Sequence, residues 1–376
     1  MAKGINIKKE IRLFLKDVKK GQNKKRVIEF KIDWKKVRHP KNMFLCYLKK
    51  LCFIVLGKVP PSKIKNSITR MLGVKLGRDV CLPMDVIFDH IYPELINVKK
   101  DTIIGGYSQL WAHEFKDGVL RVGKVDVGKE ALVCGACTVA PGADIGDGAL
   151  IGGWSYMDGK AKNYEFWGGK PCKFLKNLPK DWNYIDRSNP RKYYKESRKA
   201  IKEYIDDPKR TETFHVDYEG ARGNAGCDWY LVRSTTRIWL TAAWIEFCNF
   251  FPACGLKNFL LRFTGVKIGK GVKIPIGGRF DHIYPELITL GDNVVIEKMA
   301  YVGSHDFTNN RSTVGRISVG KNTIVGSGSA VQAGISVGED VIIEAQTFVN
   351  KDVPSKACIG GIPGKIKNPE DVETSI

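Results

Sequence analysis

Aliphatic residues recur at every sixth position along two long stretches of this chain. The first stretch has Val127, Val133, Val139, Ile145 and Ile151, and the second has Val319, Val325, Val331, Val337, Ile343 and Val349. Neither an amphipathic helix nor a half-buried strand produces a period of six. Such a period is typical of a parallel β-helix, in which each short strand forms one side of a triangular coil and points its aliphatic side chain inward. We therefore expect a mainly β fold.

Glycine often follows the aliphatic residue, as at Gly128, Gly146 and Gly320. We expect it to relax the backbone at the corner of the coil, where φ is unusual. A small residue comes four places after the aliphatic one, as at Ala131 and Ala149, where the coil is narrow.

The coil-forming unit occurs twice. The segment Asp89–Ile96 reads DHIYPELI and returns unchanged at Asp281–Ile288, and the same spacing relates His113 to His305. An internal duplication organises the chain as follows: a basic, helical arm at 1–40, a first helix and β-helix at 41–178, a connecting segment with a helix at 179–232, and a second helix and β-helix at 233–370. Within the connecting segment, 190–205 is predicted to be helical and 219–226 to be a loop.

Apolar segments precede each predicted coil, at Met43–Leu56 and Ile238–Leu256. The first is interrupted by two lysines and the second by Glu246, Asn249 and Pro252, whereas a membrane span needs about 20 predominantly apolar residues. We expect helices that pack on the coil or lie at a membrane surface.

The net charge of +21 is large, and the arm at 1–40 carries part of it. A basic arm indicates an anionic partner, such as nucleic acid, the anionic lipid of a membrane surface or a phosphate-bearing ligand. The alternative is a solvated, basic amphipathic arm. No nucleic-acid reader module occurs, so no specific nucleic acid is expected. The ten cysteines form no framework, and Cys134 and Cys137 occupy coil positions rather than a zinc motif. Cysteines without a disulfide framework suit a reducing cytoplasm. We therefore expect a cytoplasmic location, and the basic arm adds the inner face of the membrane as a place within it.

Histidines mark a break in the six-residue step. His113 follows Leu110 and His305 follows Val302, and after each the repeat fails until Val127 and Val319. A loop is therefore expected to leave the coil beside the histidine. A histidine in such a place is suited to act as a general base near neutral pH. The alternative is a partly buried histidine that only caps the coil.

The chain resembles the hexapeptide-repeat acyltransferases, especially the galactoside and maltose O-acetyltransferases and their relatives acting on envelope sugars. The resemblance depends on the opening LGVKLG and TGVKIG segments at 72–77 and 264–269, the IYPELI segment, the histidine followed by an acid and an aromatic residue, and the closing turns at Gly169–Lys173 and Gly361–Lys365. It covers most of both copies. It implies two tandem left-handed parallel β-helices.

The family resemblance also implies a reaction. His113 and His305 would take the proton from a hydroxyl, rather than an amine, of a sugar-type acceptor, and acetyl-coenzyme A would donate the acetyl group. Asp89, His90, Asp281 and His282 fall near the positions of acceptor-binding residues in relatives, although a structural role for this segment is an equal alternative. Sites of this kind lie between neighbouring coils, which implies a homotrimer.

Coenzyme A contacts follow from the same resemblance. In the second copy they are Ser327, Asn350, Lys351, Gly361 and Lys365, and in the first copy Lys173. The first copy has Gly135 and Asp158-Gly159 in place of the serine and of the Asn-Lys pair, so we expect the second copy to hold the donor.

Two other functions remain open. A γ-class carbonic anhydrase shares the β-helix but needs three histidines on a metal, and two per copy do not supply them, so no metal is expected. A non-catalytic scaffold is the other alternative, which the retention of both histidines argues against.

Overall fold

Two compact units, Met1–Ile185 and Asp186–Ile376, make up the computed structural model. It describes residues 6–22, 25–33, 41–180, 182, 190–217, 229–307 and 311–367. The loop expected at 219–226 and the ends of the basic arm lie outside these ranges. The segment 1–40 therefore groups with the first coil, and residues 186–232 group with the second.

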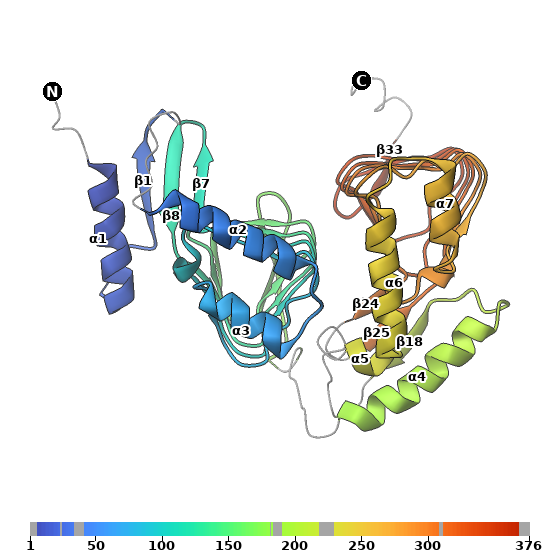
Figure 1. The fold of residues 1–376 in the computed structure, drawn as a ribbon, viewed down its shortest axis with the longest axis horizontal. Helices are drawn as coiled ribbons and strands as arrows, with labels where there is room; N and C mark the ends of the chain where they lie inside the picture. The colour runs from blue at the N-terminus through green and yellow to red at the C-terminus, as the bar shows by residue number, and fades with distance from the viewer. Residues whose placement is uncertain are drawn as a thin grey trace. The chain divides into compact units, whose positions relative to one another are not determined.

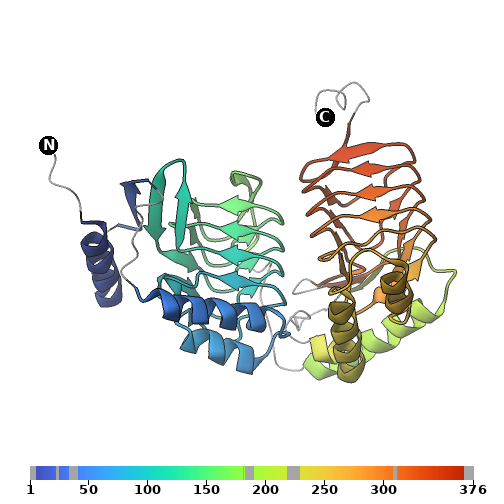
Figure 2. The same ribbon diagram turned by 45° about the horizontal axis from the view of Figure 1, so that its top comes forward.

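The first unit contains a parallel β-helix with three faces (Figures 1 and 2). Its first face consists of β2 (Lys75–Leu76), β4 (Ile96–Val98), β9 (Val125–Val127), β12 (Asp144–Ile145) and β15 (Lys160–Ala161). Its second face consists of β5 (Ile103–Ile104), β10 (Leu132–Val133), β13 (Leu150–Ile151), β16 (Glu165–Gly168) and β17 (Lys173–Asn177). Its third face consists of β3 (Ile87–Phe88), β6 (Gln109–Leu110), β11 (Thr138–Val139) and β14 (Tyr156–Met157). Every neighbouring pair is parallel except β16 and β17, which close the coil antiparallel.

The second unit repeats this arrangement. Its first face consists of β19 (Lys267–Ile268), β21 (Ile288–Leu290), β26 (Ile317–Val319) and β29 (Ser336–Val337). Its second face consists of β22 (Val295–Ile296), β27 (Ile324–Val325), β30 (Ile342–Ile343), β32 (Cys358–Gly360) and β33 (Lys365–Lys367). Its third face consists of β20 (Arg279–Phe280), β23 (Tyr301–Val302), β28 (Ala330–Val331) and β31 (Phe348–Val349).

Aliphatic stacking inside each coil accounts for the six-residue period. Val133 pairs in register with Ile151 above it and Ile104 below it, and all three are fully buried. The small residue four places after each aliphatic one, such as Ala131 or Ala149, is also fully buried.

Glycine occurs at the corners of the coil for a different reason from the one expected. Gly128 and Gly320 do not adopt a positive φ. A Cβ on Gly128 would instead lie 2.4 Å from the carbonyl carbon of Gly146, and one on Gly320 would lie 2.4 Å from the carbonyl oxygen of Gly338. These positions require glycine because successive coils approach each other closely there.

An arm packs beside each coil. In the first unit it consists of α1 (Ile7–Lys20) and β1 (Val27–Lys31), and in the second of α4 (Pro190–Asp206) and β18 (Phe214–Asp217). The predicted helices at both places are confirmed. Each strand adds antiparallel to a β-hairpin that leaves the coil, since β1 pairs with β8 (Val119–Gly123) and β18 pairs with β25 (Arg311–Val314). The duplicated arrangement therefore includes the arms, and the segment between the coils is the arm of the second unit.

Helices close one end of each coil (Figure 1). They are α2 (Met43–Gly57) and α3 (Lys63–Met71) in the first unit, and α6 (Thr235–Cys248) and α7 (Gly255–Arg262), preceded by the short α5 (Trp229–Val232), in the second. The inner face of α3 is polar: Lys65 donates to the carbonyls of Val59 and Pro83, and Asn66 donates to the carbonyl of Val80. The contacts with Val80 and Pro83 supply donors to carbonyls in the first turn of the β-helix, which has no turn beyond it. They thereby protect the open end of the sheet.

The second unit uses the equivalent residues in the same way. Lys257 donates to the carbonyl of Pro275, and Asn258 donates to that of Val272. Burial lowers the pKa of Lys65 to about 8. Among the described residues, no helix is both long enough and apolar enough to cross a membrane.

Neighbouring isoleucines on β30 provide a test of the stacking. Ile343 is 1% exposed and Ile342 is 47% exposed. We predict that Ile343→Ala lowers the free energy of unfolding by about 2–5 kcal/mol, because it leaves a cavity in the stack. The matched Ile342→Ala should change it by about 0.5 kcal/mol or less, as expected for a surface position. Urea unfolding followed by circular dichroism measures both, and equal losses would contradict the inward assignment.

Candidate active site

A β-hairpin leaves each coil directly after the third face. In the first unit it consists of β7 (His113–Lys116) and β8 (Val119–Gly123), joined by Asp117 and Gly118 with φ of 50° and 73°. Two residues with positive φ form the turn that matches the twist of a hairpin, and the Asp-Gly pair was a sequence signal for it. In the second unit β24 (His305–Phe307) and β25 (Arg311–Val314) pair antiparallel in the same way. The expected loop is therefore an ordered hairpin, and the histidine is its first residue.

A buried carboxylate holds the histidine in the first unit. Nδ1 of His113 lies 2.5 Å from Oδ2 of Asp89, which also accepts from the backbone amides of Ala112 and His113. Oδ1 accepts from the amides of Ile91 and Tyr92. Asp89 is completely buried, and the His113 side chain is 19% exposed. The carboxylate thus fixes both the ring and the backbone on either side of it.

The second unit has the same arrangement. Nδ1 of His305 lies 2.5 Å from Oδ2 of Asp281, and Oδ1 accepts from the amides of Ile283 and Tyr284. The exposed fractions are again 19% and 0%. Pro285–Leu287 and Pro93–Leu95 form single 3₁₀ turns just after these amides. The repeated DHIYPELI segment therefore builds the carboxylate and the turn that satisfies it.

Burial and pairing shift the ionisation of these groups. Burial by itself would raise the pKa of Asp281, but the charge and hydrogen bond of His305 and two backbone amides outweigh it and hold the pKa below its usual value. Asp89 has a lowered pKa for the same reasons. Burial would lower the pKa of His305, but the Asp281 carboxylate outweighs it and raises that pKa above 6.5.

This geometry suits proton transfer. Because Nδ1 is bound to a carboxylate, the ring is held in one orientation, and Nε2 is the nitrogen that can exchange a proton with a substrate. A buried carboxylate behind an imidazole also stabilises the imidazolium that forms.

Acceptor contact and a structural role were equal alternatives for the two aspartates, and their burial favours the structural role. Asp89 and Asp281 have no exposed surface, so no substrate can reach them. Their role in the structure is to orient the histidines. No pattern in the sequence distinguishes these two roles, because the partner lies 24 residues away along the chain.

Aromatic rings surround His113. The rings of His90, Tyr92 and Trp111 lie 6.4, 5.8 and 6.4 Å from it, centroid to centroid. His90 is therefore beside the candidate base, and burial lowers its pKa. His282 differs, because its Nε2 lies 3.5 Å from a carboxylate oxygen of Glu246 on α6. Glu246 was expected only to interrupt an apolar segment, and its counterpart in the first copy is Ile54.

Residues predicted to bind coenzyme A lie at two corners of the second coil. Asn350 and Lys351 follow β31 on the third face. They lie at the same corner of the β-helix as His305, two turns farther along, and each turn rises about 4.8 Å. Ser327 and Gly361 follow strands β27 and β32 of the second face, and Lys365 pairs with Gly360 beside them. Lys173 has the equivalent place in the first unit, paired with Gly168. A single β-helix therefore does not bring all these residues together.

Ser327 has a neighbour that its sequence position did not indicate. Its hydroxyl and its backbone amide both donate to Oε2 of Glu297 at 2.7 Å. The residues equivalent to Ser327 and Glu297 in the first copy are Gly135 and Gly105, so this pair exists only in the second unit.

No cluster of three or more His, Cys, Asp or Glu side chains able to hold a metal ion occurs within the described ranges. In each histidine site one carboxylate is bound to the ring, Asp89 in the first unit and Asp281 in the second.

Comparisons with known proteins place the chain in a family. A model of the hexapeptide repeat of succinyl-transferase matches residues 316–351. YvoF of Bacillus subtilis strain 168, named an acetyltransferase, is 29% identical, with 32% of this chain aligned to 72% of that protein. SAR0816 of Staphylococcus aureus strain MRSA252, also named an acetyltransferase, is 30% identical over 142 residues, which cover 37% of this chain and 88% of that protein. This chain belongs to the hexapeptide-repeat acetyltransferases. Its fold is accordingly their left-handed parallel β-helix, as the family resemblance implied.

A solved structure is similar at lower identity. It is a galactoside acetyltransferase in complex with coenzyme A, 17% identical, covering 35% of this chain and 80% of its own, with a TM-score of 0.31.

The Asp281–His305 pair predicts a titration shift. Replacing Asp281 with Asn removes the carboxylate that raises the pKa of His305, so the midpoint should move to lower pH. Asp306→Asn is the matched control, because Asp306 raises the same pKa less than Asp281 does. Imidazole NMR titration measures both midpoints, and an equal shift in the two variants would contradict the assigned cause.

Proposed function

We propose that this chain is an O-acetyltransferase that moves an acetyl group from acetyl-coenzyme A to a hydroxyl of a sugar-type acceptor. The observation that carries the proposal is the buried carboxylate–histidine pair, built identically at the same corner of both coils. Family membership supports the acetyl transfer, and the resemblance to galactoside and maltose O-acetyltransferases supports a sugar hydroxyl as the acceptor.

The proposed reaction needs one general base. Nε2 of His305, or of His113, takes the proton of the acceptor hydroxyl while that oxygen bonds to the acetyl carbonyl carbon. The carbon–sulfur bond then breaks, and the imidazolium returns the proton to the departing thiolate. Asp281 or Asp89 stabilises the imidazolium between these steps. A backbone amide near the coil would stabilise the oxyanion.

Cationic side chains suit the phosphates of the donor. Lys351 and Lys365 in the second unit and Lys173 in the first lie at corners of the β-helix, where they could contact the phosphates of coenzyme A. Asn350, Ser327 and Gly361 would contact the rest of coenzyme A. His90 and His282 remain the candidates for acceptor contact, with His90 beside His113.

Threefold assembly would complete the site. Within one β-helix the residues near His305 and those near Ser327 lie at opposite edges of the third face. A second β-helix alongside would bring one group against the other. Three chains could close two triangles of coils, one for each copy, and we therefore propose a homotrimer.

The location and the arm are part of the same proposal. The described cysteines are free thiols, which suits the reducing cytoplasm where we place the protein. The exposed lysines of α1, among them Lys8, Lys16 and Lys19, suit an anionic surface such as the inner face of a membrane.

Removing the base tests the function. We predict that His305→Ala lowers turnover with acetyl-coenzyme A and a responsive sugar at least about a hundredfold. His215→Ala is the control, since His215 is exposed on β18 and contacts Thr313 rather than a carboxylate. Thiol release across a panel of monosaccharides, nucleotide sugars and amino sugars measures the rate, and undiminished turnover in His305→Ala would refute the proposed base.

Donor binding should be unequal between the copies. Because the first copy lacks counterparts of Ser327 and Lys351, we predict one strong coenzyme A site per chain. Lys351→Ala should weaken it by roughly 1.5–3 kcal/mol, the value of one charged hydrogen bond. The control is Lys160→Ala in the first copy. Calorimetric titration counts the sites, and two equal sites of which Lys351→Ala removes only one would contradict the asymmetry.

A further inference from the structure

Helix α3 has its polar face inside and its apolar face outside. Lys65, Asn66 and Thr69 are buried against the first coil, whereas Ile64 and Met71 are 72% and 84% exposed. A helix on the surface of a globular protein normally has the opposite arrangement. The buried polar face is explained by the coil carbonyls that it caps, whereas Ile64 and Met71 of the apolar face stay exposed among the described residues of the unit.

The second unit has the same inversion at α7. Lys257 and Asn258 are buried, and Leu256, Phe259 and Phe263 are 55%, 55% and 67% exposed. Because the inversion occurs in both copies, it is a property of the duplicated design rather than of one helix.

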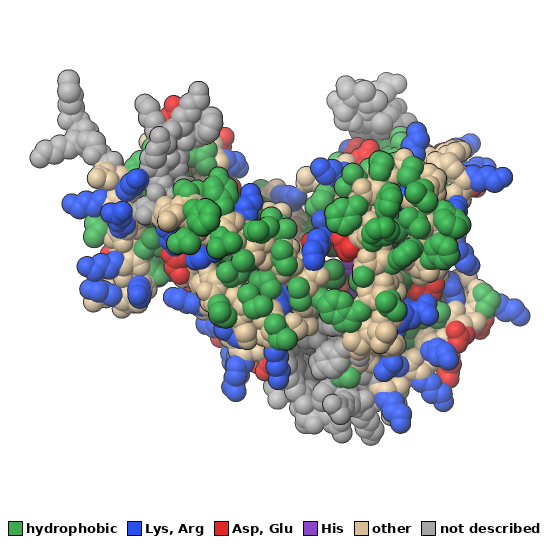
Figure 3. All heavy atoms as spheres, in the orientation of Figure 1, with side chains coloured by type: hydrophobic (Ala, Val, Ile, Leu, Met, Phe, Trp, Pro, Cys, Tyr) green, Lys and Arg blue, Asp and Glu red, His purple; other side chains and the backbone are tan. Residues whose placement is uncertain are grey.

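The adjoining helices extend this apolar surface. On α2 the exposed apolar side chains are Met43, Phe44, Leu45, Tyr47, Leu48, Leu51, Ile54 and Val55, and around α6 they are Trp239, Leu240, Trp244, Phe247 and Phe250. Figure 3 shows the hydrophobic side chains gathered over α2 and α3, and over α6 and α7. We call these the apolar caps of the first and second units. Contiguous surfaces of this kind mark interaction sites.

The charges of the first apolar cap are all positive. The sequence from Met43 to Met71 contains six lysines and arginines and no acidic residue. Trp239 and Trp244 in the second cap are of the type that concentrates at membrane–water interfaces.

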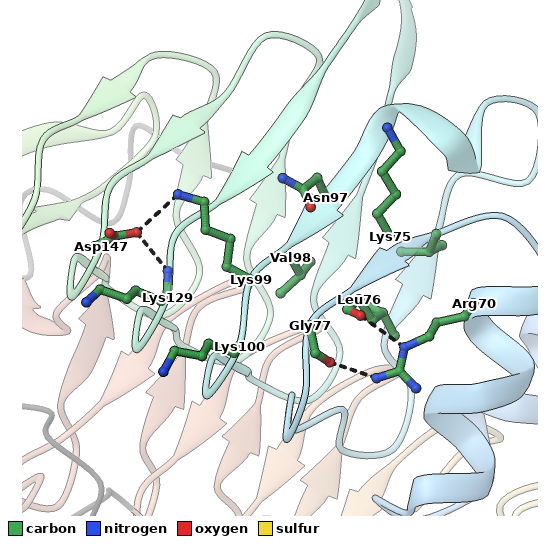
Figure 4. Close-up of a pocket in the computed structure, with 11 residues that line it drawn as sticks. Arg70, Lys75, Leu76, Gly77, Asn97, Val98, Lys99, Lys100, Lys129 and Asp147 are labelled. Carbon is green, nitrogen blue, oxygen red and sulfur yellow. Dashed lines mark hydrogen bonds and ion pairs between the residues drawn. The ribbon is translucent and has the colours of Figure 1, made fainter. Parts of the chain in front are cut away.

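A basic cleft begins at the edge of the first apolar cap. It has a volume of about 650 Å³ and is lined by Arg70 of α3, next to the exposed Met71, and by Lys75, Lys99, Lys100 and Lys129. Figure 4 shows these side chains along the corner between the first and second faces. The one carboxylate in the lining, Asp147, lies 3.4 Å from Lys99. The cleft is at a different corner from those of the histidine and of the predicted donor residues.

The second copy has less positive charge at the equivalent positions. Lys99 and Lys100 correspond to Gly291 and Asp292, and Lys129 corresponds to Lys321, which pairs with Glu339 at 3.1 Å. The second copy keeps Arg262 and Lys267 at the positions of Arg70 and Lys75, so only the pair Lys99 and Lys100 is specific to the first unit.

We propose that the two apolar caps dock on an anionic phospholipid bilayer, with a lipid phosphate in the basic cleft of the first unit. Apolar helical faces bordered by cations bury themselves at the boundary of headgroups and acyl chains, and anionic lipids add electrostatic attraction. A second copy is a poorer occupant, because it would bring one basic cap against another in a chain of net charge +21.

Sedimentation with vesicles tests the apolar caps. The full chain should bind vesicles of mixed phosphatidylcholine and phosphatidylglycerol. Phe44→Glu with Met71→Glu, or Phe250→Glu with Leu256→Glu, should each weaken binding, and the four together should weaken it at least about tenfold. Phe174→Glu with Ile342→Glu is the control, since these exposed residues lie on coils and add the same charge. A wild type that does not bind, or cap variants that bind as it does, would overturn the proposal.

Charge variants test the cleft. Lys99→Gln with Lys100→Gln should weaken binding to mixed vesicles and leave binding to pure phosphatidylcholine unchanged. Lys202→Gln with Lys209→Gln in the arm of the second unit is the matched control, since both are exposed and remove the same charge, and an equal loss there would assign the attraction to the overall charge and overturn the cleft. Light scattering of the cap variants identifies the other occupant: a smaller assembly with unchanged vesicle binding would make the caps an interface between copies.

Discussion

Stacking of one coil on the next is the constraint on which the rest of this structure depends. Each short strand pairs with the strand above and the strand below, and one aliphatic side chain per face lies on its equivalents in the neighbouring coils. Because the coils approach closely at the corners, only glycine fits at Gly128 and Gly320. Each interior strand has hydrogen-bond partners on both sides. The first turn of the β-helix, however, has carbonyls with no neighbouring strand. The chain must therefore add something other than another repeat at that end.

The added element explains the unusual helices. Lys65 and Asn66 turn their donors toward the first coil, and Lys257 and Asn258 do so in the second unit. A helix that commits its buried lysine and asparagine to the coil leaves apolar residues such as Ile64 and Met71 on the outside. The apolar caps are thus a direct consequence of closing the β-helix, and the membrane proposal gives that consequence a use.

The histidine sites show how a regular coil acquires chemistry. A hairpin replaces the next coil segment after His113, and its pairing fixes the backbone of that residue. Asp89 arrives from the preceding coil of the same face, where β3 lies beside β6. Parallel stacking therefore places carboxylate and imidazole together although 24 residues separate them. The two copies keep this pair and differ at Ser327, Lys351 and the basic cleft, which is consistent with one shared base chemistry and separate binding duties.

Much of this protein could be predicted from its sequence. The six-residue period indicated the coil, the repeated DHIYPELI indicated the duplication, and the break in the period located a histidine beside an excursion from the coil. These features are local or periodic, so they are visible along the chain. The tertiary structure alone decided that Asp89 and Asp281 hold the histidines instead of contacting a substrate, that β1 and β18 extend the hairpins, and that α3 and α7 face their apolar sides outward. Each of these depends on which residues meet across coils or at the end of a coil, and sequence spacing does not encode those contacts directly.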